Sequence, residues 1–364
     1  MPEIIVRTDI FDYGPAFRAY KDGTTDKRKG LLCNHHFLKS LQDQGFFSDP
    51  NRTTVVADIG CGEGDTIIKY LKDIQFKGGL DIRALDADPK LVGQGDDSHN
   101  GSVTIDENAP AVHNLSKAKE SQIIPLKSYR IKHGDMVQSD LRSLLYTDDE
   151  LQQSKNQFDL IYFSHSMYYV LLQDKNGTSK VLDKVFTDLL SENGIAILFH
   201  SNLEADTYTS LSCNSLGMIP DIVPTEEDRK RVCMGYLIPK SCDELGLTYF
   251  EIPFKSEIYF FNNFKKYIDI YKDLNRFHEI LDNDEALQDL LRLCFFCHRP
   301  LDEASEDLSS HGWTHLVDFA ANLIDKYGCI NVSTTMHVIL GQKVSPEVKQ
   351  KVEAAVKYTH ANKP

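Results

Sequence analysis

The sequence predicts an α/β protein built on a doubly wound, mostly parallel sheet of seven strands. Apolar runs alternate along the chain with segments whose apolar residues recur at helical spacing, the pattern of successive βα units. The run at 194–201 is almost entirely apolar, which is typical of a strand buried on both faces of a parallel sheet. The run at 54–59 leads through three alternating glycines into a helical pattern, which indicates a strand, a tight turn and a helix.

The expected elements follow this alternation, with one late hairpin at the end of the sheet and a polar, glycine-bearing loop at 92–108. A short helix from Tyr13 should end near Gly23, and a Lys- and Ala-rich tail should form a solvated helix with a frayed end. We expect strands at 54–59, 82–86, 128–133, 158–163, 194–200, 248–252 and 334–341, and further helices at 29–43, 64–73, 109–120, 178–190, 261–281, 284–298 and 312–327.

The spacing of the elements predicts an α/β domain with helical additions. Residues 1–50 read as an N-terminal helical lid that closes over bound ligands, although helices packed against the domain give the same pattern. The long connections read as a cap over the ligand mouth, and their aromatic residues fit the cap's own core equally well. The predicted parts are the lid at 1–50, an α/β domain at 51–201 and 241–345 with insertions at about 202–240 and 253–330, and a tail at 346–364.

Composition excludes several function classes. A net charge of −14 argues against unaided binding of nucleic acid, whose phosphates require a basic surface. No stretch is long and apolar enough to predict a membrane span, and Met1 is not followed by a basic and then an apolar segment, so we expect a cytoplasmic protein. Among eight cysteines only Cys294 and Cys297 have metal-ligand spacing, but two phenylalanines separate them, which indicates a buried thiol pair and no metal site.

The glycine turn is the strongest ligand-binding signal. Gly60, Gly62 and Gly64 allow the backbone to approach a ligand closely, and a helix N-terminus follows them. The acids Asp58 and Glu63 would repel a pyrophosphate and attract a cationic ligand with an amino-acid tail. Such a glycine pattern alone also fits a dinucleotide site.

Acidic residues end the next two predicted strands. Asp86 ends the second strand, where a carboxylate accepts the hydroxyl protons of a ribose in this type of fold. Together with the glycine turn it indicates a nucleoside-containing cofactor, without separating a methyltransferase from an NAD enzyme. Asp135 and the backbone of Met136 follow the third strand and are candidates for contact with an adenine amino group; a simple Gly-Asp turn is the equally weighted alternative.

Polar side chains also follow the fourth predicted strand: Ser164, His165, Tyr168 and Tyr169. Ligands of open α/β sheets lie at the carboxyl ends of central strands, so we expect these groups to line a pocket. The alternative for His165 is a helix-capping or buried structural histidine.

The stretch from Val55 to Thr66 resembles the first motif of class I S-adenosylmethionine-dependent methyltransferases, in which this loop holds the methionine part of the cofactor. The resemblance implies the class I methyltransferase fold and S-adenosyl-L-methionine as cofactor. Its implied contacts are Asp58, Gly60, Gly62, Glu63, Asp86, Asp135, Met136 and Ser164.

Further segments resemble the histamine N-methyltransferase family within that class. They are the spacing from Tyr13 through Phe17 to Asp26, the run Phe158–Val170 with its paired tyrosines, the segment Leu237–Tyr249, and the closing strand after Asn331. Asp26 matches the family's glutamate that contacts the substrate imidazole and amine, and His165 falls where the family has a glutamine. The resemblance implies substrate contacts by Tyr13, Phe17, Asp26, His165 and Asn331, and catalytic roles for His165, Tyr168 and Tyr169.

The sequence therefore predicts methylation of a small-molecule acceptor, cationic or aromatic in character, most simply N-methylation of an amine or imidazole metabolite. Asp26 would hold the cationic part of the acceptor, and His165 would accept a proton. The alternatives are an O- or S-methyltransferase of a small metabolite, a non-catalytic cofactor-binding partner protein, and an NAD-dependent dehydrogenase.

Overall fold

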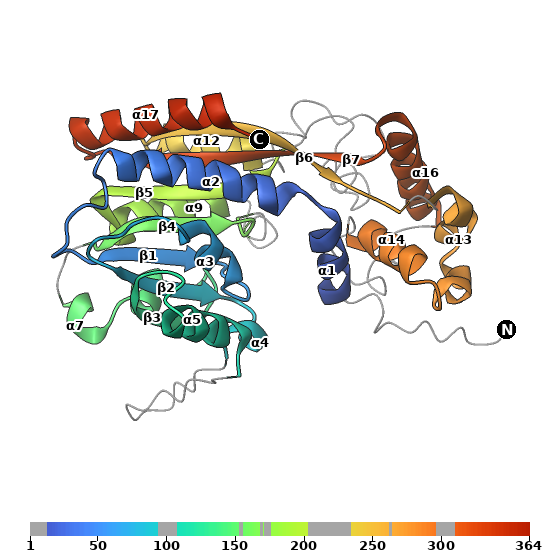
Figure 1. Ribbon diagram of the computed structural model, residues 1–364, viewed down its shortest axis with the longest axis horizontal. Helices are drawn as coiled ribbons and strands as arrows, with labels where there is room; N and C mark the ends of the chain where they lie inside the picture. The colour runs from blue at the N-terminus through green and yellow to red at the C-terminus, as the bar shows by residue number, and fades with distance from the viewer. Residues whose placement is uncertain are drawn as a thin grey trace. The chain divides into compact units, whose positions relative to one another are not determined.

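The computed structural model describes residues 13–93, 108–152, 156–167, 170, 176–202, 234–261, 264–295 and 310–364. They carry a seven-stranded sheet of order β3-β2-β1-β4-β5-β7-β6 (Figure 1). The pairs β1–β2, β2–β3, β1–β4 and β4–β5 are parallel, as βα units require. The strands are β1 Thr54–Ile59, β2 Leu80–Asp86, β3 Leu126–His133, β4 Phe158–Ser164, β5 Leu190–Ser201, β6 Thr248–Ile258 and β7 Ile330–Leu340.

Helices cover both faces of this sheet, as Figure 1 shows, so the predicted doubly wound, mostly parallel α/β fold is confirmed. On one face lie α2 Asp26–Asp43, α3 Asp65–Leu71, α5 Pro110–Glu120 and α17 Pro346–Asn362. The other face carries α6 Leu141–Leu145, α9 Gly177–Lys184, a π-helical turn Val185–Leu189 and α12 Met234–Glu244; short helices α4 Pro89–Val92 and α7 Asp148–Leu151 complete this part.

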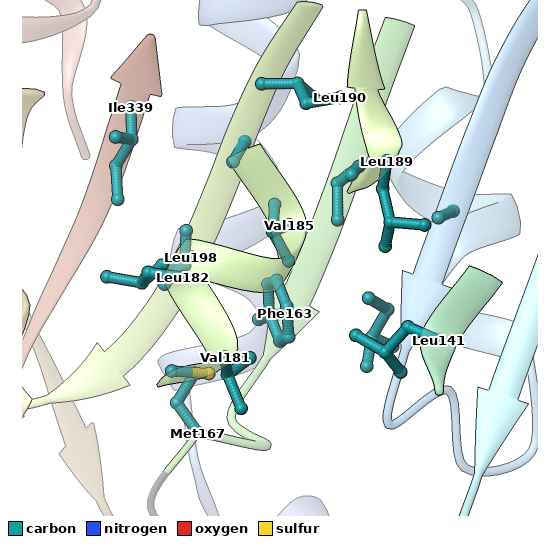
Figure 2. Packing of buried hydrophobic residues seen from close by; sticks show 14 of the residues in the cluster. Leu141, Phe163, Met167, Val181, Leu182, Val185, Leu189, Leu190, Leu198 and Ile339 are labelled. Carbon is teal, nitrogen blue, oxygen red and sulfur yellow. The ribbon is translucent and has the colours of Figure 1, made fainter. Parts of the chain in front are cut away.

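The second of these faces buries a continuous apolar core, which is drawn in Figure 2. Phe163 of β4, Leu198 of β5 and Ile339 of β7 have no solvent exposure. They belong to one cluster with Val181 and Val185 from the helix opposite. Each such side chain contributes roughly 1.5–3 kcal/mol by burial, so this core fixes the positions of the strand ends that carry the candidate site.

A buried polar link joins the helices of the opposite face to the sheet. Asn34 of α2 has no exposed surface. Its Nδ2 donates to the Tyr70 carbonyl at 3.0 Å, and its Oδ1 accepts from the Tyr162 hydroxyl at 3.0 Å. The Tyr70 hydroxyl lies 3.2 Å from Oγ of Ser164 at the end of β4. Asn34 thus fixes α2, α3 and β4 through one side chain.

We expect Asn34→Leu to lower the free energy of unfolding by about 2 kcal/mol, because it leaves the buried Tyr162 hydroxyl and Tyr70 carbonyl without their partner. Denaturation in urea followed by circular dichroism measures the loss. Adding Tyr162→Phe should recover part of it, since one orphaned polar group is then removed. A double variant as unstable as the sum of the two single variants would contradict this account.

The chain divides into two compact units. One comprises Gly30–His200, Met234–Pro253 and Thr335–Pro364 and contains most of the sheet; the other comprises Met1–Lys29, Ser201–Cys233 and Phe254–Thr334. The latter has its own core around Tyr271, Leu290, Trp313 and Val317. Its helical elements are α1 Tyr13–Gly23, 3₁₀ turns Phe264–Tyr267 and Leu274–Ile280, α13 Ile268–Lys272, α14 Asp284–Phe295 and α16 Ser310–Tyr327.

The predicted domain boundaries can be compared with these two units at a few places. Their boundary at Lys29 and Gly30 falls inside the stretch 1–50 that the sequence assigned to a lid. Helix α12 begins within the expected insertion at 202–240, yet its Met234 and Ile238 belong to the core beneath the sheet. Of that insertion, residues 203–233 lie outside the described part of the chain, as do 94–107 of the expected polar loop. The lid and cap roles remain predictions.

The predicted continuous helix at 261–281 is wrong. The described chain there forms two 3₁₀ turns and the five-residue α13. Nε1 of Trp313 donates to the Tyr271 carbonyl at 2.5 Å. The backbone leaves the helical conformation at Asp273, whose ψ is 96°, and the short pieces pack in one buried cluster with Trp313.

The helix predicted for the tail is confirmed, but one of its faces is buried and not solvated. Helix α17 is regular to Asn362 and buries Val352, Ala355 and Val356. Ser345 caps its N-terminus by accepting from the Val348 N–H at 3.3 Å. Near its end, His360 bonds the Glu251 carbonyl at 2.8 Å, so the helix is attached along its length.

Candidate functional site

The glycine turn after β1 requires glycine at each of its three positions. Gly60, Gly62 and Gly64 have φ values of 77°, 56° and 70°, in the left-handed region that side chains disfavour. The N–H groups of Gly60 and Cys61 both donate to the Leu85 carbonyl, at 2.7 and 3.0 Å. The turn is therefore fixed to the end of β2 before helix α3 begins.

Gly62 gives this turn an open surface. A Cβ built on Gly62 would have no atom within 4 Å, whereas one on Gly60 would collide with Ser166. The Gly62 N–H donates to Oδ2 of Asp86 at 2.7 Å, and Oδ1 of Asp86 accepts from the Asp88 N–H at 2.9 Å. Each carboxylate oxygen offers two acceptor sites, so Asp86 is oriented by the backbone and keeps capacity for ligand hydroxyls.

Two further acids accompany the turn. Asp58 is 2% exposed near the end of β1, and Glu63 is exposed, with its carbonyl accepting from Nδ2 of Asn114 at 2.8 Å. Burial, and then the Asp58 and Asp86 carboxylates, raise the pKa of the Cys61 thiol well above its ordinary value. Cys61 is thus a protonated, inert thiol within an acidic environment.

The residues after β3 join the same edge through the backbone. The Gly134 N–H donates to the Asp86 carbonyl at 2.9 Å. Oδ1 of Asp135 accepts from the N–H groups of Val137 and Gln138 at 2.7 and 3.0 Å, so Asp135 supports its own turn. Met136 is half-buried, and its Cε lies 3.7 Å from the position a Cβ on Gly60 would take.

The turn after β4 forms hydrogen bonds with three different elements. Oγ of Ser164 bonds the Tyr70 hydroxyl, the His165 N–H donates to the Phe199 carbonyl at 2.9 Å, and Oγ of Ser166 donates to the Ile59 carbonyl at 2.8 Å. His165 is half-buried with a φ of 58°. The predicted catalytic residues Tyr168 and Tyr169 lie outside the described residues.

The structure therefore brings most predicted cofactor residues to one edge of the sheet, where the parallel strands β1, β2, β3 and β4 end. Within the described ranges, no cluster of three His, Cys, Asp or Glu side chains is suited to a metal ion. The same part of the chain contains no helix with the length and apolar character to cross a membrane.

Apart from His165, the predicted acceptor-binding residues belong to the other compact unit. Asp26 begins α2 and is 2% exposed. Its Oδ1 accepts from Oγ of Ser256 at 3.0 Å and from Oγ1 of Thr334 at 2.7 Å, and its Oδ2 lies 3.5 Å from the Tyr20 hydroxyl. The carboxylate thus ties the start of α2 to β6, β7 and α1.

The other predicted acceptor contacts are less closely grouped. Phe17 is half-buried, with Nζ of Lys27 5.2 Å from its ring centroid. Tyr13 begins α1, but its side chain is outside the described residues. Asn331 is half-buried in β7, three positions before Thr334, and strand alternation directs it to the face opposite Thr334. Tyr20 therefore lies beside Asp26, whereas Asn331 is on the face of β7 opposite the one that contacts Asp26.

Sequence reasoning did not select Ser166 or Tyr70 for the site. Ser166 is 4% exposed and packs against Gly60, and Tyr70 is 4% exposed beside Ser164. The sequence around Ser166 has no pattern that indicates a functional role. Tyr70 follows the apolar spacing of its helix, so the sequence predicts only that it is buried. Their partners are more than 90 positions away, so only the fold reveals them.

No protein-family model and no curated protein matches the chain. Solved structures similar to it include the YcgJ protein from Bacillus subtilis, with 12% identity, a TM-score of 0.40 and coverage of 83% of this chain and 98% of that one. The [4+2]-cyclase SpnF has 13% identity, a TM-score of 0.35 and coverage of 80% and 76%. Haemonchus contortus phosphoethanolamine N-methyltransferase 2 has 12% identity, a TM-score of 0.34 and coverage of 84% and 52%. At these values the likenesses assign no activity.

Proposed function

We propose that the protein is an S-adenosylmethionine-dependent methyltransferase of a small molecule, with N-methylation of an amine or imidazole as its reaction. The observation that carries the proposal is the left-handed glycine turn, open at Gly62 and bonded to the oriented carboxylate of Asp86. Acids at Asp58 and Asp86 suit a sulfonium cofactor with an amino-acid tail better than a pyrophosphate.

The residues at this edge fit the cofactor. Asp86 would accept from ribose hydroxyls, and the uncrowded backbone at Gly62 would face the methionine part. Asp135, Met136 and Ser164 are proposed contacts at the neighbouring strand ends. When bound, the cofactor supplies a methyl group carried on a positive sulfur.

The chain's own tasks are to bind and orient the acceptor, exclude water and receive a proton. The acceptor nitrogen must be unprotonated when its lone pair attacks. We assign proton acceptance to His165, because an imidazole changes protonation near neutral pH. Asp26 is proposed to bind a cationic group of the acceptor, and Tyr13, Phe17, Tyr168, Tyr169 and Asn331 are proposed acceptor contacts.

Calorimetric titration with S-adenosylmethionine and, separately, NAD tests the cofactor. We expect the first to bind and the second not to, and Gly62→Ala to weaken binding about tenfold, or 1.4 kcal/mol, because a Cβ would occupy the open surface. Gly328→Ala is the matched control: Gly328 also has a positive φ, 73°, and a Cβ built on it would have no atom within 4 Å, but it lies outside the candidate site. Equal weakening by both variants would contradict the proposed cofactor site.

An acceptor screen with imidazoles and aryl amines tests the reaction. Mass spectrometry of the products should place the methyl group on nitrogen. Methyl transfer to oxygen or sulfur would favour the alternative small-molecule reactions, and cofactor binding without turnover on any acceptor would favour a non-catalytic binding protein. NAD binding alone would overturn the proposal in favour of a dehydrogenase.

A further inference from the structure

Three consecutive residues at the end of β4 bond three separate elements. Ser164 contacts Tyr70 of α3, His165 donates from its backbone to Phe199 of β5, and Ser166 donates from its hydroxyl to the last residue of β1. Three bonds to three elements restrain the backbone of this turn at successive residues.

His165 needs this restraint. Its φ of 58° lies in the left-handed region, which a residue with a Cβ adopts only at an energetic cost. Strained conformations of this kind persist when the surrounding contacts over-determine them, and they are frequent at functional sites. The bond from the His165 N–H to Phe199 and the bond of the next residue, Ser166, to Ile59 hold His165 in this conformation.

Ser166 also shapes the glycine turn. Its Cβ would lie 2.3 Å from a Cβ built on Gly60, so the two residues touch only because Gly60 has no side chain. Its hydroxyl bonds the Ile59 carbonyl, one residue before Gly60, and it is 4% exposed. One side chain therefore contacts the glycine turn directly and adjoins the strained histidine in the sequence.

We propose that Ser166 is a positioning residue that couples the glycine turn to the turn carrying His165. Through it, the conformation of Gly60 and that of His165 depend on each other, so a ligand seated on the glycine turn also fixes the histidine backbone. The effect of a ligand rests on the proposed function, because it requires a cofactor bound at the glycine turn. The coupling between the two turns is present without any ligand.

The test compares Ser166→Ala with Ser241→Ala. Ser241 is the matched control, because it is 3% exposed in α12 and its hydroxyl bonds Ser179 of α9 at 2.9 Å, so its bond joins two helices and neither turn. Two quantities are measured for each variant: amide hydrogen exchange by mass spectrometry in the unliganded protein, and the dissociation constant of S-adenosylhomocysteine by calorimetry. Ser166→Cys, which retains a weak donor, is the conservative variant.

For Ser166→Ala we expect faster exchange in peptides covering both 59–64 and 164–167, together with about tenfold weaker binding of S-adenosylhomocysteine. Ser166→Cys should restore part of both effects, and Ser241→Ala should change neither. Faster exchange in one turn alone, or unchanged affinity despite faster exchange, would overturn the positioning role. If the unaltered protein binds no S-adenosylhomocysteine, the proposed cofactor fails, while the exchange of the two turns still decides whether Ser166 couples them.

Discussion

Replacing Glu150 by alanine is expected to lower the free energy of unfolding by about 3 kcal/mol, near the lower end of the range for breaking a buried ion pair. Its partner Arg83 is 5% exposed in β2. Nη1 and Nη2 of Arg83 donate to the two Glu150 oxygens at 2.8 and 2.6 Å. Asp81 and the Leu145 carbonyl also accept from the guanidinium, which limits the loss.

The hydrogen bonds around Glu150 stabilise its charged form in the folded protein. Burial acts to raise its pKa, but the hydrogen bonds from Arg83 and from the Thr147 N–H outweigh burial, and the pKa lies below its ordinary value. Removal of the carboxylate therefore leaves a buried cation with one acidic partner and frees the Thr147 N–H, which donates to Glu150 at 2.7 Å. The guanidinium cannot respond by losing its proton.

Urea denaturation followed by circular dichroism is the suitable measurement, because the only tryptophan, Trp313, lies in the other compact unit. The control is Glu279→Ala, which removes the acid from the exposed bidentate pair with Arg276. An exposed ion pair adds little to stability, so that variant should unfold like the unaltered protein. A similarly small effect of Glu150→Ala would mean that Asp81 alone satisfies Arg83.

The sheet was predictable because its strands carry strong local patterns. The expected 54–59 strand matches β1, and each of the other six expected strands overlaps an observed one. The glycine turn was predictable for the same reason, since left-handed positions select glycine locally. The class of fold therefore follows from short stretches of sequence read independently.

Features that depend on distant partners were not predictable. The segment 261–281 has helical spacing, yet it forms short pieces that pack in one buried cluster with the distant Trp313 and Val317. The tail reads as polar, but its few apolar residues meet on one face of α17. The resemblance selected Asp26 without indicating that hydroxyls from Ser256 and Thr334 surround it. In each case the deciding contact joins residues separated by tens to hundreds of positions.

His337 should make the protein sensitive to acid. It has no exposed surface in β7, and its ring stacks on that of His200 with centroids 4.6 Å apart. Burial lowers the pKa of His337 to about 3, although Glu251 Oε1 lies 3.7 Å from its Nε2. Glu251 is half-exposed, so we take burial as the stronger influence. The folded protein therefore keeps His337 neutral where the unfolded chain protonates it.

The direction of the pH effect follows from that difference. An unfolded histidine has a pKa of about 6.5, so between pH 6.5 and about 3 the unfolded chain binds the proton that the folded protein excludes. The stabilising contribution is complete above the unfolded pKa and is lost as the pH falls towards the folded one. For His337 alone the loss between pH 7 and pH 4 is about 3 kcal/mol.

The decisive comparison is His337→Phe, which preserves an aromatic ring against His200 and removes the titrating group. Urea denaturation at pH 7, 6, 5 and 4 should show the variant gaining about 3 kcal/mol relative to the unaltered protein by pH 4. His133→Gln serves as control, because it removes a histidine from the exposed end of β3 and leaves the buried His337 in place. Parallel curves for His337→Phe and the unaltered protein would mean that the folded protein admits a proton at His337, through Glu251 or through water reaching the stacked pair.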